Sequence, residues 1–360
     1  MSLDFGINFF PNVGPDEQSG ESYWNQALDL VGKCDELGYT HVRTVEHHFH
    51  PYGGYSPNPI IFLTAASQRT KNARLITGAV IPAFSNPLKL AGEIGMLDSI
   101  SRGRLEVGFA RAFLPHEFAR FGIDMDESRD RFNEGVAQIV ALLKGENVTM
   151  DGKFRSFKDT TTLPRPVQTP HPPLWNVALS SPESFVNTGK WGFNMMAQPS
   201  VGPEKLAELL GVYRESWKSA GHKGDPRIAL AFMMYCAPDD KQAMEESRVP
   251  VDTYYVTLAD AAKEWSEGVS SKDYPGYEKM IARLEKDNLE SRVERGAAWV
   301  GSPERLRDVI ADYQRKVGGF DIASLQINTK SLPFEKAAAS MELFAREVIP
   351  HFTADIRKRA

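Results

Sequence analysis

The sequence predicts an α/β fold, a single (β/α)8 TIM barrel spanning residues 1–360. Short apolar runs typical of buried parallel strands alternate with helix-like segments, and this unit occurs eight times along the chain. A length of 360 residues accommodates such a barrel as one domain with insertions. No Gly-x-Gly-x-x-Gly fingerprint follows the first apolar run, which argues against an open dinucleotide-binding sheet.

The first four units occupy residues 3–145. Their strands are predicted at residues 3–9, 40–46, 74–81 and 104–110. The helices that follow them are predicted at residues 21–38, 59–70, 87–101 and 127–145. Gly38 is a typical helix end and Pro59 a typical first helical residue, so these start and stop signals agree with the helix boundaries that the periodicity predicts.

The last four units occupy residues 173–349. Their strands are predicted at residues 173–179, 192–198, 227–237 and 321–328. Their helices are predicted at residues 181–192, 204–221, 302–319 and 334–349.

Two segments exceed a minimal barrel. Residues 111–172 form an insertion after the fourth strand, with a hairpin predicted at 147–157. Residues 238–301 form a second insertion after the seventh strand. Because loops at the carboxyl ends of barrel strands lie over the active site, we expect a lid at about 265–297.

Composition narrows the class of protein. The chain has 42 Lys and Arg against 47 Asp and Glu, a net charge of −5, which gives no electrostatic case for nucleic acid or anionic membrane. No apolar run is long enough to span a bilayer and no secretory signal is recognisable, so we expect a cytoplasmic protein. Cys34 and Cys236 lie far apart in apolar surroundings and are expected to be buried free thiols.

Three of the eight histidines fall within residues 47–50, directly after the second predicted strand. Active sites of such barrels lie at the carboxyl ends of the strands, so Glu46, His47 and His48 are expected at the catalytic rim. An imidazole titrates near neutral pH, which makes His47 a candidate general base that Glu46 or another carboxylate could orient. The alternative is a pair of exposed loop histidines. No further residues with ligand spacing accompany them, so no metal site is predicted.

Three features of an anion site follow neighbouring strands. Arg111 comes directly after the fourth strand, Arg129 lies in the first turn of the next helix, and Ser180 precedes the helix after the fifth strand. Arginines and helix N-termini on one rim would bind a phosphate group. The alternative is that Arg129 pairs with Asp126 or Glu127 and that the serines only cap a helix.

Several longer segments carry a family resemblance. They are EHHF at 46–49, NP at 58–59, LDSISRGRLEVGFAR at 97–111, FGIDMDESR at 121–129, VGSPE at 300–304 and SMELFAREVIPHF at 340–352. In these segments the chain resembles bacterial luciferase, most closely its catalytic alpha-type subunit, and the wider luciferase-like flavin-dependent monooxygenases. The resemblance covers essentially the whole chain in order.

The resemblance implies a TIM barrel that binds reduced FMN, delivered by a separate reductase, and reacts it with O2. The resulting flavin C4a-(hydro)peroxide would oxygenate a small organic substrate such as an aldehyde, a ketone or a secondary metabolite. By the same resemblance His47 is the catalytic histidine, while Arg111, Arg129 and Ser180 hold the FMN phosphate.

The resemblance also implies a non-prolyl cis peptide beneath the flavin ring, near Gly78–Ala79. The remaining residues expected at the cofactor are Glu46, His48, Ala110, Ala178 and Leu179. Ala110 replaces the reactive cysteine of the luciferases, which argues against efficient light emission. Glu117 stands where the luciferases have an aspartate near the flavin.

Alternative functions remain open. The first is a deazaflavin-dependent oxidoreductase on the same barrel, and the second is a catalytically silent flavin-binding partner subunit. The intact His47 and Arg111 argue against the second, because the non-catalytic luciferase subunit lacks both. A metal-dependent hydrolase would need a ligand set that the chain does not show.

A dimer is also expected, since the luciferases associate through their early helices. Helix 87–101 carries the small and apolar residues Ala91, Gly92, Gly95 and Met96, which could pack against a second chain.

Overall fold

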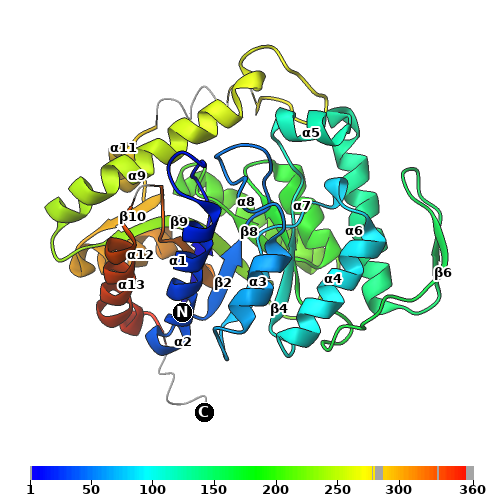
Figure 1. The fold of residues 1–360 in the computed structure, drawn as a ribbon, viewed down its shortest axis with the longest axis horizontal. Coiled ribbons are helices and arrows are strands. Elements are labelled where there is room, and N and C mark those ends of the chain that lie inside the picture. Colours follow the sequence, from blue (N-terminus) through cyan, green and yellow to red (C-terminus); the bar gives the residue numbers. More distant parts are fainter. Residues whose placement is uncertain (1, 278, 280–286, 331, 354–360) are drawn as a thin grey trace.

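A computed structural model describes residues 2–277, 279, 287–330 and 332–353 and shows a closed parallel barrel surrounded by helices (Figure 1). The barrel strands follow the order β1-β2-β3-β4-β7-β8-β9-β11, and β11 pairs back onto β1. The predicted (β/α)8 TIM-barrel class is therefore confirmed.

The elements lie close to the predicted ranges. The barrel strands are β1 (Asp4–Phe9), β2 (His41–Thr44), β3 (Arg74–Thr77), β4 (Leu105–Phe109), β7 (Leu174–Ala178), β8 (Asn194–Ala197), β9 (Ile228–Cys236) and β11 (Ile322–Gln326). The surrounding helices are α1 (Gly20–Gly32), α2 (Cys34–Leu37), α3 (Pro59–Ser67), α4 (Pro87–Ile100), α6 (Ser128–Lys144), α7 (Pro182–Trp191), α8 (Pro203–Ser219), α12 (Pro303–Lys316) and α13 (Phe334–Glu347). The single helix predicted at 21–38 is divided into α1 and α2 at Lys33.

Local sequence explains why several helices begin where they do. Asn58, Asn86 and Ser302 each precede a proline at the first helical position. Their side chains accept hydrogen bonds from backbone N–H groups of the first turn, which lack partners within the helix. The proline loses nothing there, because its missing N–H would have been unpaired.

A further strand, β10 (Ala298–Gly301), was not predicted. It pairs in parallel with the second half of β9, whose first half pairs with β8. Trp299 and Val300 of this strand are buried. The insertion predicted at 238–301 therefore includes a strand of the main sheet, which only a four-residue apolar run, AAWV, indicates in the sequence.

The two long segments contain structure of their own. Residues 111–172 hold α5 (Pro115–Phe121), η2 (Met125–Glu127), α6 and an antiparallel pair, β5 (Val148–Met150) with β6 (Phe157–Thr160), that projects to the right in Figure 1. Residues 238–297 hold α9 (Asp240–Ala261), η3 (Lys263–Trp265) and α11 (Leu289–Glu294). The lid predicted at 265–297 includes residues 278 and 280–286, which lie outside the described residues.

Strand alternation divides the barrel into an outer and an inner side. Phe5, Ile7 and Phe9 of β1 pack outward against the helices in the main hydrophobic core. A small inner cluster contains Ile76, Trp175, Met196, Ala229 and Ile322, one residue from each of five strands. By the same alternation, Asn8 and Arg43 point into the barrel.

The small residues of α4 pack within the chain. A Cβ at Gly95 would lie 2.2 Å from the carbonyl oxygen of Pro164, so this glycine permits close approach of the segment 163–165. Met96 is exposed. The dimer stays a prediction.

Two other sequence expectations bear on the described residues. Cys34 and Cys236 are buried and unpaired, as predicted. Within the ranges that the structure covers, no helix has the length and apolar character needed to cross a bilayer.

Candidate active site

His47 and His48 lie at the carboxyl-terminal mouth of the barrel but face different neighbours. The His47 ring lies against Phe10 and Tyr52, with ring centroids 5.5 and 5.2 Å apart. The His48 ring lies edge-on against Phe121 at 4.8 Å. Both histidines are buried, which excludes the interpretation as exposed loop residues.

A buried carboxylate, Glu117 of α5, orients His47. Its Oε1 lies 3.1 Å from His47 Nδ1 and also accepts a hydrogen bond of 2.8 Å from the backbone N–H of His48. If Nδ1 carries the proton that it donates to Glu117, Nε2 is left to exchange a proton with a bound molecule. Glu117 Oε2 is buried and has no hydrogen-bond partner among the described residues.

Glu46 holds the second histidine. Its Oε1 lies 3.1 Å from His48 Nε2, and its Oε2 accepts a hydrogen bond of 3.0 Å from the backbone N–H of Ile81. Burial raises the pKa of Glu46, although the hydrogen bond to His48 opposes the shift. Glu46 and His48 line a hollow of about 190 Å³ together with residues of α4 and η1 (Pro82–Phe84), whereas His47 does not.

Aromatic residues enclose the space around His47. The hydroxyl groups of Tyr52 and Tyr254 are 3.0 Å apart, and Phe10 packs against both rings. Phe113 lies edge-on to the imidazole at 6.1 Å. Such a wall excludes water from the imidazole.

The third and fourth strands end beside this space. The peptide bond Gly78–Ala79 is cis, as predicted for a site beneath a flavin ring. Ala110 donates its backbone N–H to the carbonyl of Val80 at 3.0 Å, so the cis peptide and Ala110 lie on adjoining strand ends.

Arg111 is partly buried beneath the described part of the predicted lid. Its guanidinium lies over the ring of Tyr274, 4.3 Å from the centroid, and the Tyr274 hydroxyl donates to the carbonyl of Ala112. Trp265 Nε1 donates to the carbonyl of Phe113 at 2.9 Å. Arg111 Nη1 is buried and has no hydrogen-bond partner in the described ranges, so it is available to an anionic oxygen.

Arg129 lies in the first turn of α6, as predicted, but its ion-pair partners differ from those considered. It pairs with Glu183 of α7, with Nη1 2.6 Å from Oε1, and its Nε lies 3.8 Å from Asp273. The proposed pairing with Asp126 or Glu127 is wrong, because those carboxylates bind Ser271 and Arg131 instead.

Asp273 occupies the N-terminus of α6. Its Oδ2 accepts hydrogen bonds of 2.9 Å from the backbone N–H of Arg129 and 3.2 Å from the hydroxyl of Ser128. Unpaired N–H groups and the helix dipole favour an anion at this place. In this structure the anion is a carboxylate of the chain itself.

The residues predicted at the end of the fifth strand are divided. Ala178 is buried and packs in the outer core, Leu179 is half-buried, and Ser180 is exposed. Ser181 is the N-cap of α7 and Pro182 its first residue, as expected, although the Ser181 side chain makes no capping hydrogen bond.

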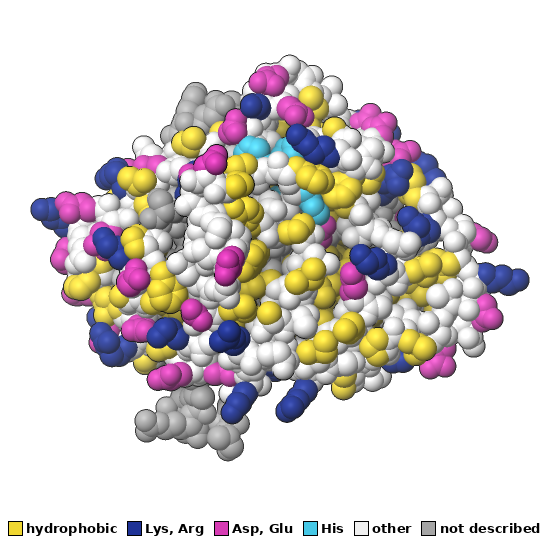
Figure 2. Space-filling view, viewed as in Figure 1, with side chains coloured by type: hydrophobic (Ala, Val, Ile, Leu, Met, Phe, Trp, Pro, Cys, Tyr) yellow, Lys and Arg dark blue, Asp and Glu magenta, His cyan; other side chains and the backbone are white. Residues whose placement is uncertain are grey.

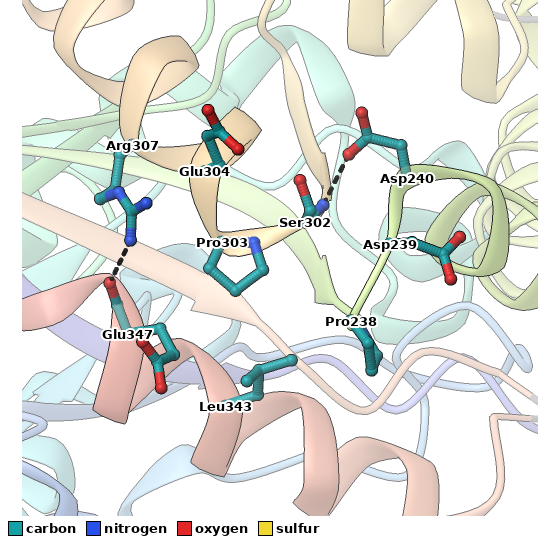
Figure 3. Close-up of a pocket in the computed structure, with 9 residues that line it drawn as sticks. All are labelled: Pro238, Asp239, Asp240, Ser302, Pro303, Glu304, Arg307, Leu343 and Glu347. Atoms are coloured by element: carbon teal, nitrogen blue, oxygen red, sulfur yellow. Dashed lines mark hydrogen bonds between the residues drawn. The ribbon is translucent and has the colours of Figure 1, made fainter.

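The surface view agrees with this layout. Figure 2 shows histidine side chains gathered in the upper middle of one face, bordered by hydrophobic and by Lys or Arg side chains. A separate hollow of about 540 Å³ lies where α9 and α12 begin, and none of its lining residues is a predicted site residue (Figure 3). Two hydrogen bonds join residues that line it: Ser302 N–H donates to Asp240 at 2.7 Å and Arg307 to the carbonyl of Glu347 at 3.0 Å.

Sequence reasoning missed the partners that complete the mouth. Glu117 was noted only as a flavin neighbour, and Asp273 and Arg43 were not singled out. Each lies far along the chain from its partner, 70 residues from His47 in the case of Glu117. Within the described residues no group of three or more His, Cys, Asp or Glu side chains could hold a metal ion.

Several known proteins are similar to this chain over most of its length. Residues 3–318 match the family model described as luciferase-like monooxygenase. The oxygenase component of a flavin-dependent trigonelline monooxygenase from Acinetobacter baylyi is 29% identical over 94% of this chain and 92% of its own length. The monooxygenase RslO1 from Streptomyces bottropensis is 40% identical, with a TM-score of 0.86 over 98% of this chain and 100% of that one.

More distant solved structures show the same fold. The oxygenating constituent of 3,6-diketocamphane monooxygenase from Pseudomonas putida, in complex with FMN, is 22% identical, with a TM-score of 0.81 over 97% of this chain and 99% of that one. An F420-dependent secondary alcohol dehydrogenase is 16% identical, with a TM-score of 0.76 over 98% of this chain and 100% of that one.

Proposed function

Because the chain belongs to the luciferase-like monooxygenase family, we propose that it uses reduced FMN and O2 to oxygenate a small organic substrate. The observation that carries this proposal is the His47–Glu117 pair. It is buried among aromatic rings at the barrel mouth, where the fourth strand ends near Arg111. The F420-dependent neighbour keeps a deazaflavin enzyme as the second candidate.

The residues of the chain would bind the cofactor, orient the catalytic histidine and exclude water. When bound, reduced FMN would supply two electrons and O2 would supply the transferred oxygen atom, with the second oxygen atom reduced to water. His47 would hold or move a proton at Nε2, because Glu117 engages Nδ1. The surrounding rings of Phe10, Tyr52 and Phe113 keep water from this proton.

The donors at the expected phosphate site fit an anionic group. Arg111 has a buried nitrogen without a partner in the described residues, and the N-terminus of α6 already binds a carboxylate. A phosphate that reaches Arg129 would therefore replace Asp273 and release the segment that carries it. Ser180 is exposed nearby, three residues before Glu183.

The function is tested by supplying photoreduced FMN and air and profiling candidate substrates by mass spectrometry. We expect oxygen consumption and a product heavier by one oxygen atom. Hydride transfer to a deazaflavin without oxygen consumption would instead support the second candidate.

His47→Ala should retain FMN binding but lower the yield of oxygenated product per reduced FMN by about 100-fold or more, the contribution of a general acid–base group. The control is His50→Ala, which removes a neighbouring imidazole that pairs with Asp260 at the surface. Equal yields in His47→Ala and the unaltered protein would exclude His47 from the reaction.

The phosphate site is tested by two opposite changes. Arg111→Ala should weaken the binding of FMN far more than the binding of riboflavin, which lacks the phosphate. Asp273→Asn should increase the affinity for FMN several-fold and leave the affinity for riboflavin unchanged, because it removes a charge that competes with the phosphate. Equal effects on both ligands would mean that the phosphate lies elsewhere.

We also propose partners for this activity. The trigonelline relative is called an oxygenase component, which supports a separate flavin reductase for this chain as well. A dimer through α3 and α4, where Ile61 and Met96 are exposed, accords with the predicted association. Turnover by the isolated chain would exclude the silent partner subunit.

A further inference from the structure

Arg43 of β2 is a buried cation near the mouth of the barrel with few partners. Its side chain points inward and the residue is 4% exposed. Its Nη2 donates a hydrogen bond of 2.8 Å to the carbonyl of Gly78. Its Nε and Nη1 are buried and have no partner among the described residues. A guanidinium has five N–H groups, so most of its donor capacity is unused.

The charge of Arg43 is also unpaired in the described part of the chain. Its ionisation is influenced by burial and then by Tyr254. Among the described residues, no carboxylate forms an ion pair with it. Burial lowers the pKa of Arg43 to about 10, so the guanidinium remains charged at neutral pH. An uncompensated buried charge costs several kcal/mol, on the order of the stability of a whole domain.

Neighbouring strands place other polar groups without partners in the same region. Asn8 of β1 lies opposite Arg43 in the strand register, and Gln326 of β11 lies opposite Asn8. Asn8 Oδ1 and Gln326 Nε2 are buried and have no hydrogen-bond partner in the ranges described. The same holds for the hydroxyl of Ser324, two residues before Gln326 on β11 and opposite Gly6. Because native proteins rarely leave several buried polar groups unpaired in one region, these groups point to a ligand.

The guanidinium is held in place by the backbone of the third strand. A Cβ at Gly78 would come within 1.9 Å of Arg43 Nε, so only glycine allows the side chain to lie on this peptide. Gly78 also begins the cis peptide that is expected beneath the flavin ring.

Arg43 adjoins the site that contains His47. The charge of Arg43 acts on Tyr254, whose hydroxyl lies 3.0 Å from that of Tyr52. The Tyr52 ring in turn contacts His47 at 5.2 Å. Arg43 and the aromatic-lined space around His47 therefore share Tyr254 as a neighbour.

We propose that Arg43 binds an electron-rich, anionic oxygen or N–C=O group of a molecule held in the barrel mouth. Two sources share this chemistry: the pyrimidine end of reduced, anionic flavin, and a carboxylate or enolate oxygen of the substrate. The inference rests on the proposed function only for the identity of the flavin.

Stability without ligand is the first test, because it requires no activity. Arg43→Met removes the charge at nearly constant volume and should leave the unfolding free energy unchanged or higher. The matched control is Arg74→Met, which removes an arginine paired with Glu106 and should lower it. If Arg43→Met loses as much stability as Arg74→Met, Arg43 is structural and the proposal is overturned.

Ligand affinity identifies the source. If the flavin is the source, Arg43→Met weakens reduced FMN at least tenfold more than oxidised FMN. This ratio equals a fall of about 30 mV in the two-electron midpoint potential. If the substrate is the source, the flavin ratio is unchanged. Binding of benzoate, a planar carboxylate probe, to the FMN-loaded protein is then weakened at least tenfold.

Arg43→Lys, which keeps the charge, should restore part of either affinity. Unchanged affinities for both probes in Arg43→Met would overturn the proposal. Should the unaltered protein bind no FMN, the proposed function fails, while ligand-free stability and benzoate binding to the free protein still test Arg43.

Discussion

The two ends of the barrel interior differ in how completely their polar side chains are paired. At the amino-terminal end, Glu106 binds Arg74, Arg227 at 3.1 Å and the indole N–H of Trp175 at 2.6 Å. Towards the carboxyl-terminal end, Arg43 makes one hydrogen bond and has no ion pair within the described residues. Strand β2 contributes to both regions. His41 contacts Arg227 at the amino-terminal end, and Arg43 follows it two residues later.

The difference indicates which polar residues stabilise the fold and which await a ligand. Burial alone would raise the pKa of Glu106, but the charges of Arg227 and Arg74 outweigh it and the pKa is lowered. Polar groups that satisfy one another need no further partner, whereas orphaned ones reduce stability until something binds. Barrel enzymes place their ligands at the carboxyl-terminal end, where the orphaned groups lie.

The largest expected effect is at Glu106. Glu106→Gln should lower the unfolding free energy by about 3 kcal/mol, because an amide NH2 then faces the donors of Trp175 or the arginines. This is the low end of the range for broken buried pairs, since Arg74 and Arg227 are 32% and 35% exposed and can be solvated. Urea denaturation measures the loss.

The control for Glu106 is Glu146→Gln, which removes the same charge from an exposed loop. A similar small loss in both variants would mean that the amino-terminal network does not stabilise the barrel. The contrast between the two ends would then fail.

The next largest effect is a dependence of the unfolding free energy on pH that arises from His41. Its Nδ1 lies 2.7 Å from the Thr40 hydroxyl, and its Nε2 accepts from Arg227 at 3.2 Å. Burial lowers the pKa of His41 from 6.5 to about 4, with Arg227 contributing to the shift. Between these values the unfolded chain binds a proton that the folded protein does not, so stability falls as pH falls through this window.

The contribution of His41 should amount to about 2–3 kcal/mol between pH 7 and pH 4. His41→Gln keeps an acceptor for Arg227 without a titrating group, so its stability should depend less on pH. The difference in slope between the two proteins isolates His41, because the lowered pKa of His50 is common to both. Parallel slopes would contradict the assignment.

The sequence predicted features that depend on local pattern. The eight units, the first-turn position of Arg129 and the cis peptide at Gly78–Ala79 follow from periodicity, capping or family resemblance. The pairing of charges did not follow, because it depends on distant residues: Asp273 reaches the start of α6 from 144 residues away. Strand β10 was missed because four apolar residues are too few to distinguish from a turn within a charged segment.

The orphaned state of Arg43 could not be predicted for a similar reason. The alternation in HVRT indicates only that Arg43 lies on the same side as His41. Whether an inward arginine meets a carboxylate depends on which residues the other seven strands place at that height. Glu106 provides that partner at one end of the barrel, and no residue in the described ranges provides it at the other.

The smallest effect is expected at Ser324. It is compared with the same substitution, serine to alanine, at a second buried serine, Ser340. Ser324 and Ser340 are 4% and 2% exposed, but only the Ser340 hydroxyl has a donor, the backbone N–H of Cys236 at 2.7 Å. Ser340→Ala should cost about 1–3 kcal/mol, since it leaves a buried N–H unpaired. Ser324→Ala should change the unfolding free energy by less than about 0.5 kcal/mol or raise it, because the hydroxyl has no partner among the described residues to lose. A loss at Ser324 equal to that at Ser340 would show that polar groups without partners inside the barrel already stabilise the ligand-free fold, and would remove the argument that they serve a ligand.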